Sequence, residues 1–106
     1  MSRGSTVTAQ EVMRITRAPA ARGRGRHVTS LSVAWGGGTA PSGGADLVRV
    51  DEDGSSYWRY EESSSLWDGP QVEQATRPDQ AVRLARQLTG FARIHGVRIS
   101  RMTHTY

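Results

Sequence analysis

The chain has 106 residues and a formal net charge of +4. That length allows one domain with one small core, which a second copy of the chain or another partner would complete. All fourteen basic residues are arginine, a bias that suits a GC-rich genome, and there is no lysine or cysteine. The missing cysteine excludes disulfides, thiolate metal sites and cysteine nucleophiles. The missing lysine excludes a Gly-Lys phosphate-binding loop and Schiff-base chemistry.

Charge is divided into three blocks. Residues 1–30 carry six arginines and one acid, residues 31–73 carry two arginines and eight acids, and residues 74–106 carry six arginines and one acid. Such a layout either presents a positive face to an anionic partner or neutralises itself when the ends fold onto the middle. No apolar run fits a signal peptide or a membrane span, so we expect a cytoplasmic protein without a membrane partner.

The first segments in chain order leave one alternative open. We expect residues 1–8 to be a flexible lead, residues 9–102 to form a single α+β domain, and residues 103–106 to fray. Thr8 followed by Glu11 fits a capping box that opens a short helix. The same segment, 12–17, also fits a first strand, which we favour because so short a helix is only marginally stable.

The middle of the chain predicts strands. Residues 28–35 alternate in polarity, whereas residues 36–45 hold five glycines and one proline, which predicts a mobile connection. Strands over 47–50 and 56–61 are joined by Asp53-Gly54, a strong hairpin signal. Adjacent Glu61 and Glu62 then lie on opposite faces and cannot form an acid/base pair. A brief strand is expected over 71–74, and four aromatic residues are expected in the core: Trp35, Trp58, Tyr60 and Trp67.

The best-defined element is a helix that runs to His95. Thr76 is the expected N-cap, and Gly96 is expected to end the helix in a left-handed conformation. A final strand over 97–101 follows. The fold class is therefore α+β, with a small curved antiparallel sheet of four to five strands, one amphipathic C-terminal helix packed across it and a short final strand. The apolar side of the helix contains Ala81, Leu84, Ala85, Leu88, Phe91, Ala92 and His95.

Arginine patterns point to nucleic acid. Arg22-Gly23-Arg24 resembles the core of the AT-hook kind of minor-groove reader, although Gly25 stands where that motif has proline. Three arginines along one helix face, continued on the final strand, have a spacing that can follow a phosphate backbone. The predicted nucleic-acid contacts are Arg22, Arg24, Arg26, Arg83, Arg86, Arg93, Arg98 and Arg101.

Two functions from different classes follow. The first is a small non-catalytic basic protein, of phage or mobile-element origin, that associates with DNA or RNA. The second is a protein-interaction module, an adaptor or an inhibitor of a host protein complex, that uses the acidic hairpin and exposed aromatics. Neither function needs a cofactor, a metal or a small-molecule substrate, and we expect no enzyme activity. The residues expected to carry the second function are Asp51, Glu52, Asp53, Tyr57 and Arg59.

Overall fold

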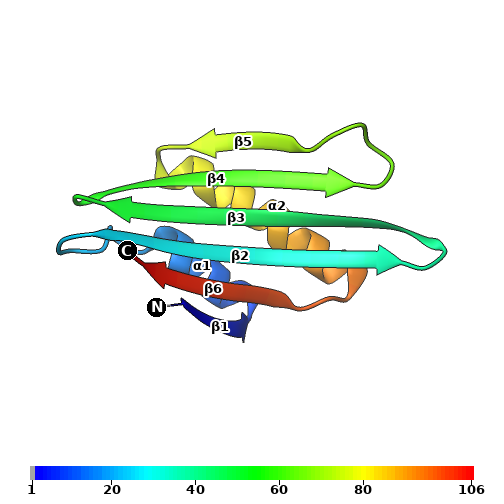
Figure 1. Cartoon of the computed structure of the whole chain (residues 1–106), viewed down its shortest axis with the longest axis horizontal. Helices are drawn as coiled ribbons and strands as arrows, with labels where there is room; N and C mark the ends of the chain where they lie inside the picture. The colour runs from blue at the N-terminus through cyan, green and yellow to red at the C-terminus, as the bar shows by residue number, and fades with distance from the viewer. Residues whose placement is uncertain (1) are drawn as a thin grey trace.

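A computed structural model describes the backbone of residues 2–106 and the side chains from Gly4 onward. Two helices and six strands follow one another along the chain (Figure 1). Their bounds are β1 Ser2–Val7, α1 Ala9–Arg17, β2 Arg26–Gly37, β3 Ala40–Glu52, β4 Ser55–Ser64, β5 Gln71–Ala75, α2 Pro78–His95 and β6 Ile99–Thr105.

The strands form one antiparallel sheet in the order β1-β6-β2-β3-β4-β5. Both helices lie on one face of this sheet, and the other face is open (Figure 1). The molecule is 47 Å long, with the strands running along its length. The predicted class, an antiparallel α+β sheet crossed by a C-terminal helix, is confirmed, with one strand more than the upper number expected and a second helix.

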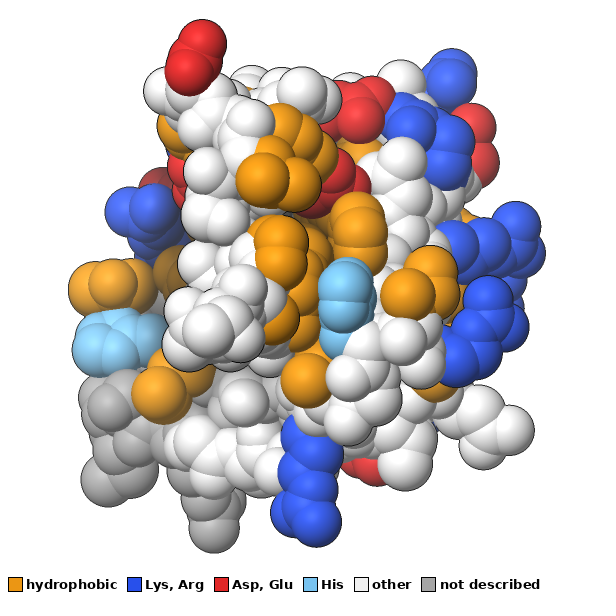
Figure 2. Space-filling model, turned by 90° about the vertical axis from the view of Figure 1, so that its right-hand side faces the viewer, with side chains coloured by type: hydrophobic (Ala, Val, Ile, Leu, Met, Phe, Trp, Pro, Cys, Tyr) orange, Lys and Arg blue, Asp and Glu red, His pale blue; other side chains and the backbone are white. Residues whose placement is uncertain are grey.

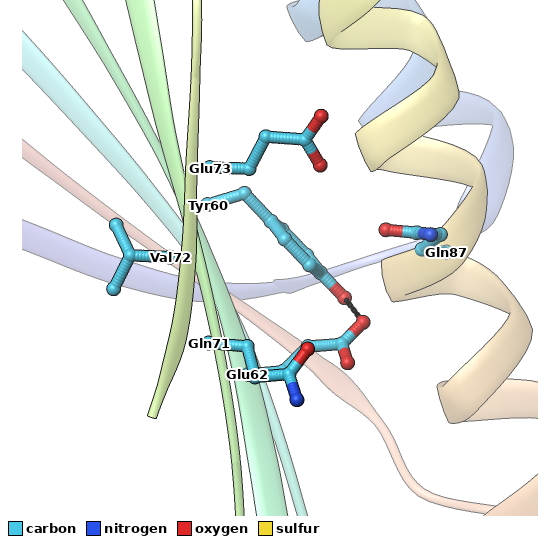
Figure 3. A pocket seen from close by; sticks show the side chains of 6 residues that line it. All are labelled: Tyr60, Glu62, Gln71, Val72, Glu73 and Gln87. Carbon is cyan, nitrogen blue, oxygen red and sulfur yellow. Dashed lines mark hydrogen bonds between the residues drawn. The ribbon is translucent and has the colours of Figure 1, made fainter. Parts of the chain in front are cut away.

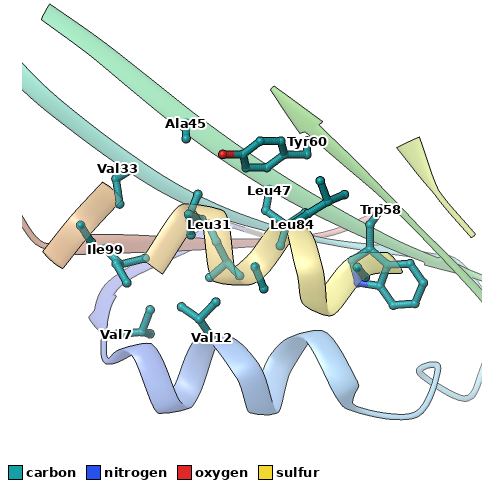
Figure 4. Close-up of a cluster of buried hydrophobic side chains, with 14 of the residues drawn as sticks. Val7, Val12, Leu31, Val33, Ala45, Leu47, Trp58, Tyr60, Leu84 and Ile99 are labelled. Atoms are coloured by element: carbon teal, nitrogen blue, oxygen red, sulfur yellow. The ribbon is translucent and has the colours of Figure 1, made fainter. Parts of the chain in front are cut away.

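The core lies between the sheet and the two helices (Figure 4). Leu31, Leu47 and Tyr60 are paired across β2, β3 and β4, so their side chains share the helix-covered face. Leu84 of α2 and Val12 of α1 are fully buried against this layer. The helix periodicity read from the sequence is confirmed, because Ala81, Leu84, Ala85, Leu88 and Ala92 are all buried.

The N-terminal segment corrects two expectations. Residues 9–17 form α1 rather than the favoured strand, and the capping box is present: Glu11 N–H donates to Thr8 Oγ1 at 3.1 Å, and Thr8 N–H donates to Glu11 Oε1 at 3.2 Å. The helix is stable at this length because it packs on α2. Ser2–Val7, expected within a flexible lead, is β1, which pairs with β6. β6 in turn extends to Thr105, into the segment expected to fray.

The glycine-rich segment 36–45 is a hairpin rather than a loose connection. β2 continues to Gly37 and β3 begins at Ala40, so only two residues form the turn. Gly36, Gly37 and Gly38 all have positive φ, which lets the chain reverse tightly. The glycines therefore serve the turn geometry while the backbone keeps its ladder hydrogen bonds. The Asp53-Gly54 hairpin is confirmed, with positive φ at both residues.

Helix α2 begins one residue later than predicted. Arg77, not Thr76, is the N-cap, and its side chain makes no capping hydrogen bond. Pro78 occupies the first helical position, where the missing N–H costs nothing. Gly96 ends the helix with φ +64°, as expected, and its N–H bonds back to the last turn. Within residues 2–106, no helix is both long and apolar enough to cross a membrane.

A buried arginine fastens α1 to the sheet near the β3–β4 hairpin. The Arg49 guanidinium donates to the carbonyls of Ile15 and Ala18 at the C-terminal end of α1 and forms an ion pair with Asp51, Nε to Oδ1, at 3.0 Å. Ser56 accepts a further hydrogen bond at 3.1 Å, and the guanidinium carbon lies 5.4 Å from the Trp58 ring centroid. The charge is thus enclosed and fully paired.

Candidate functional site

The opposite end of the sheet carries a stack of aromatic rings. Trp35, near the end of β2, lies flat against His95 at 4.4 Å between ring centroids and 3° between planes, and against Phe91 at 4.8 Å and 19°. Phe91 and His95 are one turn apart on α2. Trp35 and Phe91 are only half-buried and His95 is exposed. The stack therefore joins the helix to the sheet while leaving aromatic surface in contact with solvent.

The sequence makes room for this stack at Gly43. That residue pairs with Trp35 across β2 and β3, and a Cβ placed on it would lie 2.7 Å from Trp35 Cζ2 and 2.8 Å from the Ser63 carbonyl. Only a residue without a side chain lets the indole lie against β3 at this point. Glycine at position 43 is therefore required by the packing of Trp35, which the glycine content of the chain does not reveal.

The same end of the molecule carries exposed aliphatic and aromatic side chains. Leu66 is 75% exposed and Trp67 is 41% exposed, both in the loop between β4 and β5, and Ile94 next to His95 is 72% exposed. The loop is held in place, because Ser65 N–H donates to the Ser42 carbonyl at 2.8 Å. Figure 2 looks onto this end and shows hydrophobic side chains gathered in its middle, with acidic groups above them.

A pocket of about 190 Å³ opens beside the stack, between β4, β5 and α2 (Figure 3). Tyr60 and Glu62 line it from β4, Glu73 from β5 and Gln87 from α2. On α2, Gln87 lies one helical turn before Phe91 of the stack. On β4, Glu62 lies two residues before Ser64, which is paired through Gly43 of β3 with Trp35 of β2. The acidic pocket and the aromatic stack are therefore neighbouring parts of one surface, the aromatic end.

The two carboxylates of the pocket have different partners. Glu73 forms an ion pair with Arg83 of α2, at the rim. Glu62 accepts a hydrogen bond from the Tyr60 hydroxyl at 2.6 Å and has no cationic partner among the residues that the structure describes. Burial, and next the Glu62 hydrogen bond and charge, raise the pKa of Tyr60 above its ordinary value. Tyr60 therefore keeps its proton, and its hydroxyl holds the Glu62 side chain in place.

Three of the predicted nucleic-acid residues gather on the helical side of the molecule. Arg86 and Arg93 of α2 line a shallow hollow of about 310 Å³ together with Ala9. Arg93 and Arg98 line a neighbouring hollow of about 250 Å³. Within residues 2–106 none of these three arginines forms an ion pair.

The other five predicted arginines are either paired or lie elsewhere, and Arg83, although only one helical turn before Arg86, is one of the paired ones. Arg83 is paired with Glu73, and Arg101, paired with Leu31 across the strands, points to the helix-covered face with its Nε buried. Arg26 lies at the start of β2, with its guanidinium 5.5 Å from the Tyr106 ring centroid. Arg22 and Arg24 are exposed in the loop between α1 and β2. The structure therefore does not bring the eight arginines onto one surface.

The residues predicted for protein binding are also divided. Asp51 belongs to the buried Arg49 network, whereas Glu52 and Asp53 are exposed at the β3–β4 hairpin. Tyr57, 42% exposed, and Arg59 point to the open face of the sheet. The acidic hairpin lies at the Arg49 end, whereas the exposed side chains of Leu66, Trp67 and Ile94 lie at the aromatic end.

Sequence reasoning missed the combination at the aromatic end. It placed Trp35 and Trp67 in the core with Trp58 and Tyr60, but only the last two are buried. It assigned Glu61 and Glu62 correctly to opposite faces, and the helix-covered face of Glu62 turns out to open into the pocket. The signal available in the sequence was an acidic residue on the buried face of a strand, which needs a reason for its placement.

No group of three or more histidine, cysteine or acidic side chains within residues 2–106 is arranged to hold a metal ion. Comparison of the chain with protein-family models, curated proteins and solved structures finds no match.

Proposed function

We propose that the protein is an interaction module that binds a protein partner through its aromatic end and acts by binding rather than by catalysis. The observation that carries the proposal is the half-exposed stack of Trp35, Phe91 and His95 beside a carboxylate-lined pocket. Aromatic side chains with adjacent polar groups supply most of the affinity at protein interfaces.

The small number of apolar residues in the chain makes the exposure of large apolar side chains at the aromatic end an argument for a partner. A chain with few apolar residues gains most by burying the large ones, because each aromatic side chain removes roughly 150–250 Å² from water. Leu66 and Ile94 nevertheless face solvent, and Trp35 is only partly buried. A partner that covers this end would recover the missing burial. The free carboxylate of Glu62 would disfavour phosphate groups here and so favours a protein.

The test starts from peptides selected in an unbiased way. Random linear peptides displayed on phage are selected against the wild-type chain, and enriched sequences are synthesised and titrated against variants. We expect Trp35→Ala and Leu66→Ser to weaken binding by at least about tenfold, since central aromatic and apolar contacts dominate such interfaces. Circular dichroism serves as the check that the Trp35→Ala variant is folded. Leu66 is exposed, so its replacement should not disturb the core.

Met102→Ser is the matched control. Met102 is 51% exposed, on the open face of the sheet away from the stack, and its replacement should leave the affinity unchanged. Selection that enriches no peptide, or peptides that bind the Trp35 and Leu66 variants as well as they bind the wild type, would overturn the proposal.

The helical side supports a second candidate, binding of nucleic acid through Arg86, Arg93 and Arg98. These three arginines line adjoining hollows and have no ion-pair partner among the described residues. Three phosphate contacts predict a roughly fortyfold loss of affinity for duplex DNA between about 50 and about 200 mM salt.

Fluorescence anisotropy with a labelled DNA duplex and a labelled RNA strand measures the affinity for nucleic acid and its dependence on salt. Arg86→Ala combined with Arg93→Ala should remove most of the salt dependence, and Arg59→Ala, on the open face, should not. Affinity that barely changes with salt, or a double variant that binds like the wild type, rules the candidate out.

A further inference from the structure

We infer that the pocket beside the aromatic stack receives an arginine side chain of the protein partner. This inference rests on the proposed function and names the chemistry of its contact. The pocket contributes a carboxylate, Glu62, that is fixed by the Tyr60 hydroxyl and has no cationic partner among the residues described. A cationic group entering it would add a charge-assisted hydrogen bond without losing one that already exists.

The size of the pocket selects a single side chain. Its volume of about 190 Å³ is below the roughly 300–1,000 Å³ of pockets that enclose drug-sized ligands. The side chains that face into it are arranged around one space: in Figure 3 Tyr60, Glu62, Glu73 and Gln87 converge, while Val72 points to the other side of β5. Carboxylate and amide oxygens are acceptors, which suits a donor with several N–H groups.

The molecule already contains a complete version of this arrangement at its other end. There, Arg49 pairs with the carboxylate of Asp51 and lies 5.4 Å from the Trp58 ring centroid. At the aromatic end Glu62 and Trp35 lie on the same helix-covered face, with Glu62 two residues before the row of Trp35, but none of the side chains that the structure describes supplies an arginine to Glu62. Charge complementarity therefore points to an arginine from outside.

Arginine fits better than lysine for two physical reasons. Its planar guanidinium offers five N–H donors in a fixed fork and so can bond Glu62 and the Gln87 side chain together. The same plane packs on aromatic rings, which the neighbouring stack of Trp35 and Phe91 presents. The apolar residues flanking the arginine in the partner would lie on the exposed Leu66 and Ile94 side chains.

Matched tripeptides test the inference. The probes are acetyl-Leu-Arg-Leu-amide, its lysine twin and its citrulline twin, which keeps the shape of arginine but is uncharged. Each is titrated into ¹⁵N-labelled protein and followed by NMR. We expect the arginine probe to bind at least about fivefold more tightly than the citrulline probe, a modest preference because Glu62 is only half-buried. The lysine probe should fall between them.

Two variants test whether the preference for the arginine probe over the citrulline probe comes from Glu62. Glu62→Gln keeps an acceptor for the Tyr60 hydroxyl but removes the charge, and should abolish the difference between the arginine and citrulline probes. Glu52→Gln, exposed at the far end, should retain it. Equal binding of the two probes to the wild type, no binding of either, or a preference that survives Glu62→Gln overturns the inference.

The outcomes separate this inference from the proposed function. If arginine and citrulline probes bind equally and both still shift the Trp35 indole signal, the arginine pocket is refuted while the aromatic end remains a binding surface. If the selected peptides are also insensitive to Trp35→Ala, the proposed function fails as well.

Discussion

The two ends of the sheet use similar side chains in opposite ways. Beside the β3–β4 hairpin, Arg49, Asp51 and Trp58 are enclosed, and the charges of Arg49 and Asp51 are paired with each other. At the other end, Trp35 is only partly buried, and Glu62 has no cationic partner among the side chains that the structure describes. The first arrangement fixes α1 on the sheet. The second leaves the same kinds of interaction open to a partner, so stability and binding are assigned to different ends.

The largest expected effect comes from breaking the enclosed end. Arg49→Met leaves Asp51 without its cation and the end of α1 without two donors, so we expect a loss of about 3–5 kcal/mol in the free energy of unfolding, measured with urea. Arg59→Met is the control, because Arg59 is exposed on the open face and should change stability by less than about 0.5 kcal/mol. Equal effects of the two variants would contradict the role given to Arg49.

Two of the three tryptophans, Trp58 and Trp35, compare the two ends of the sheet directly. Trp58 is 2% exposed, and Trp58→Ala should cost about 3–5 kcal/mol through lost burial and a cavity. Trp35→Ala should cost about half as much, since its ring is already partly hydrated. Urea unfolding of both variants measures the difference. A Trp35 variant as unstable as the Trp58 variant would mean that the aromatic end is chiefly structural.

Gly43→Ala sharpens the comparison without removing an aromatic ring. The added methyl would lie within 3 Å of the Trp35 ring and the Ser63 carbonyl, so the indole must move from its position on α2. Overpacking of this kind costs about 1–3 kcal/mol. We expect that loss in thermal unfolding together with a change in near-ultraviolet circular dichroism. Gly69→Ala, where a methyl meets open space, should change neither signal.

The smallest effect is a pH dependence of the pocket. Burial, and next the hydrogen bond and charge of Glu62, raise the pKa of Tyr60 in the folded chain. In the unfolded chain the tyrosine ionises at about pH 10. The stabilisation from protonated Tyr60 is therefore complete below about pH 10. It is lost as the pH rises above that value, by about 1.4 kcal/mol per pH unit.

Unfolding curves of the wild type and Tyr60→Phe on either side of about pH 10 measure this slope, since phenylalanine has no proton to lose. The wild type should lose stability more steeply than the variant. Parallel curves would show that Tyr60 ionises equally in the folded and unfolded chain.

Local signals in the sequence predicted the fold well where one element determines its own shape. The periodicity of α2, its Gly96 end and the Asp53-Gly54 hairpin depend on neighbours in the chain, and all three are confirmed. Elements that depend on distant partners were harder. α1 is stabilised by packing on α2, and β1 by pairing with β6, so their short sequences gave a wrong or incomplete picture.

The candidate site was less predictable because it depends on register. Glu62, Glu73 and Gln87 come from β4, β5 and α2, and nothing in the sequence states how these elements align. The sequence predicted that four aromatic residues lie in the core, and this is confirmed for Trp58 and Tyr60. The exposure of Trp35 follows from its position at the last turn of α2, where the covering helix ends.

The most direct measurement follows the indole N–H signals of the tryptophans in one ¹⁵N NMR spectrum during titration with acetyl-Leu-Arg-Leu-amide. The Trp35 signal should move progressively with probe concentration while the Trp58 signal stays in place, since Trp58 is enclosed and its neighbouring carboxylate already has Arg49. A Trp35 signal that does not move, or one that moves no more than the Trp58 signal, would contradict the division of the molecule into a structural end and a binding end.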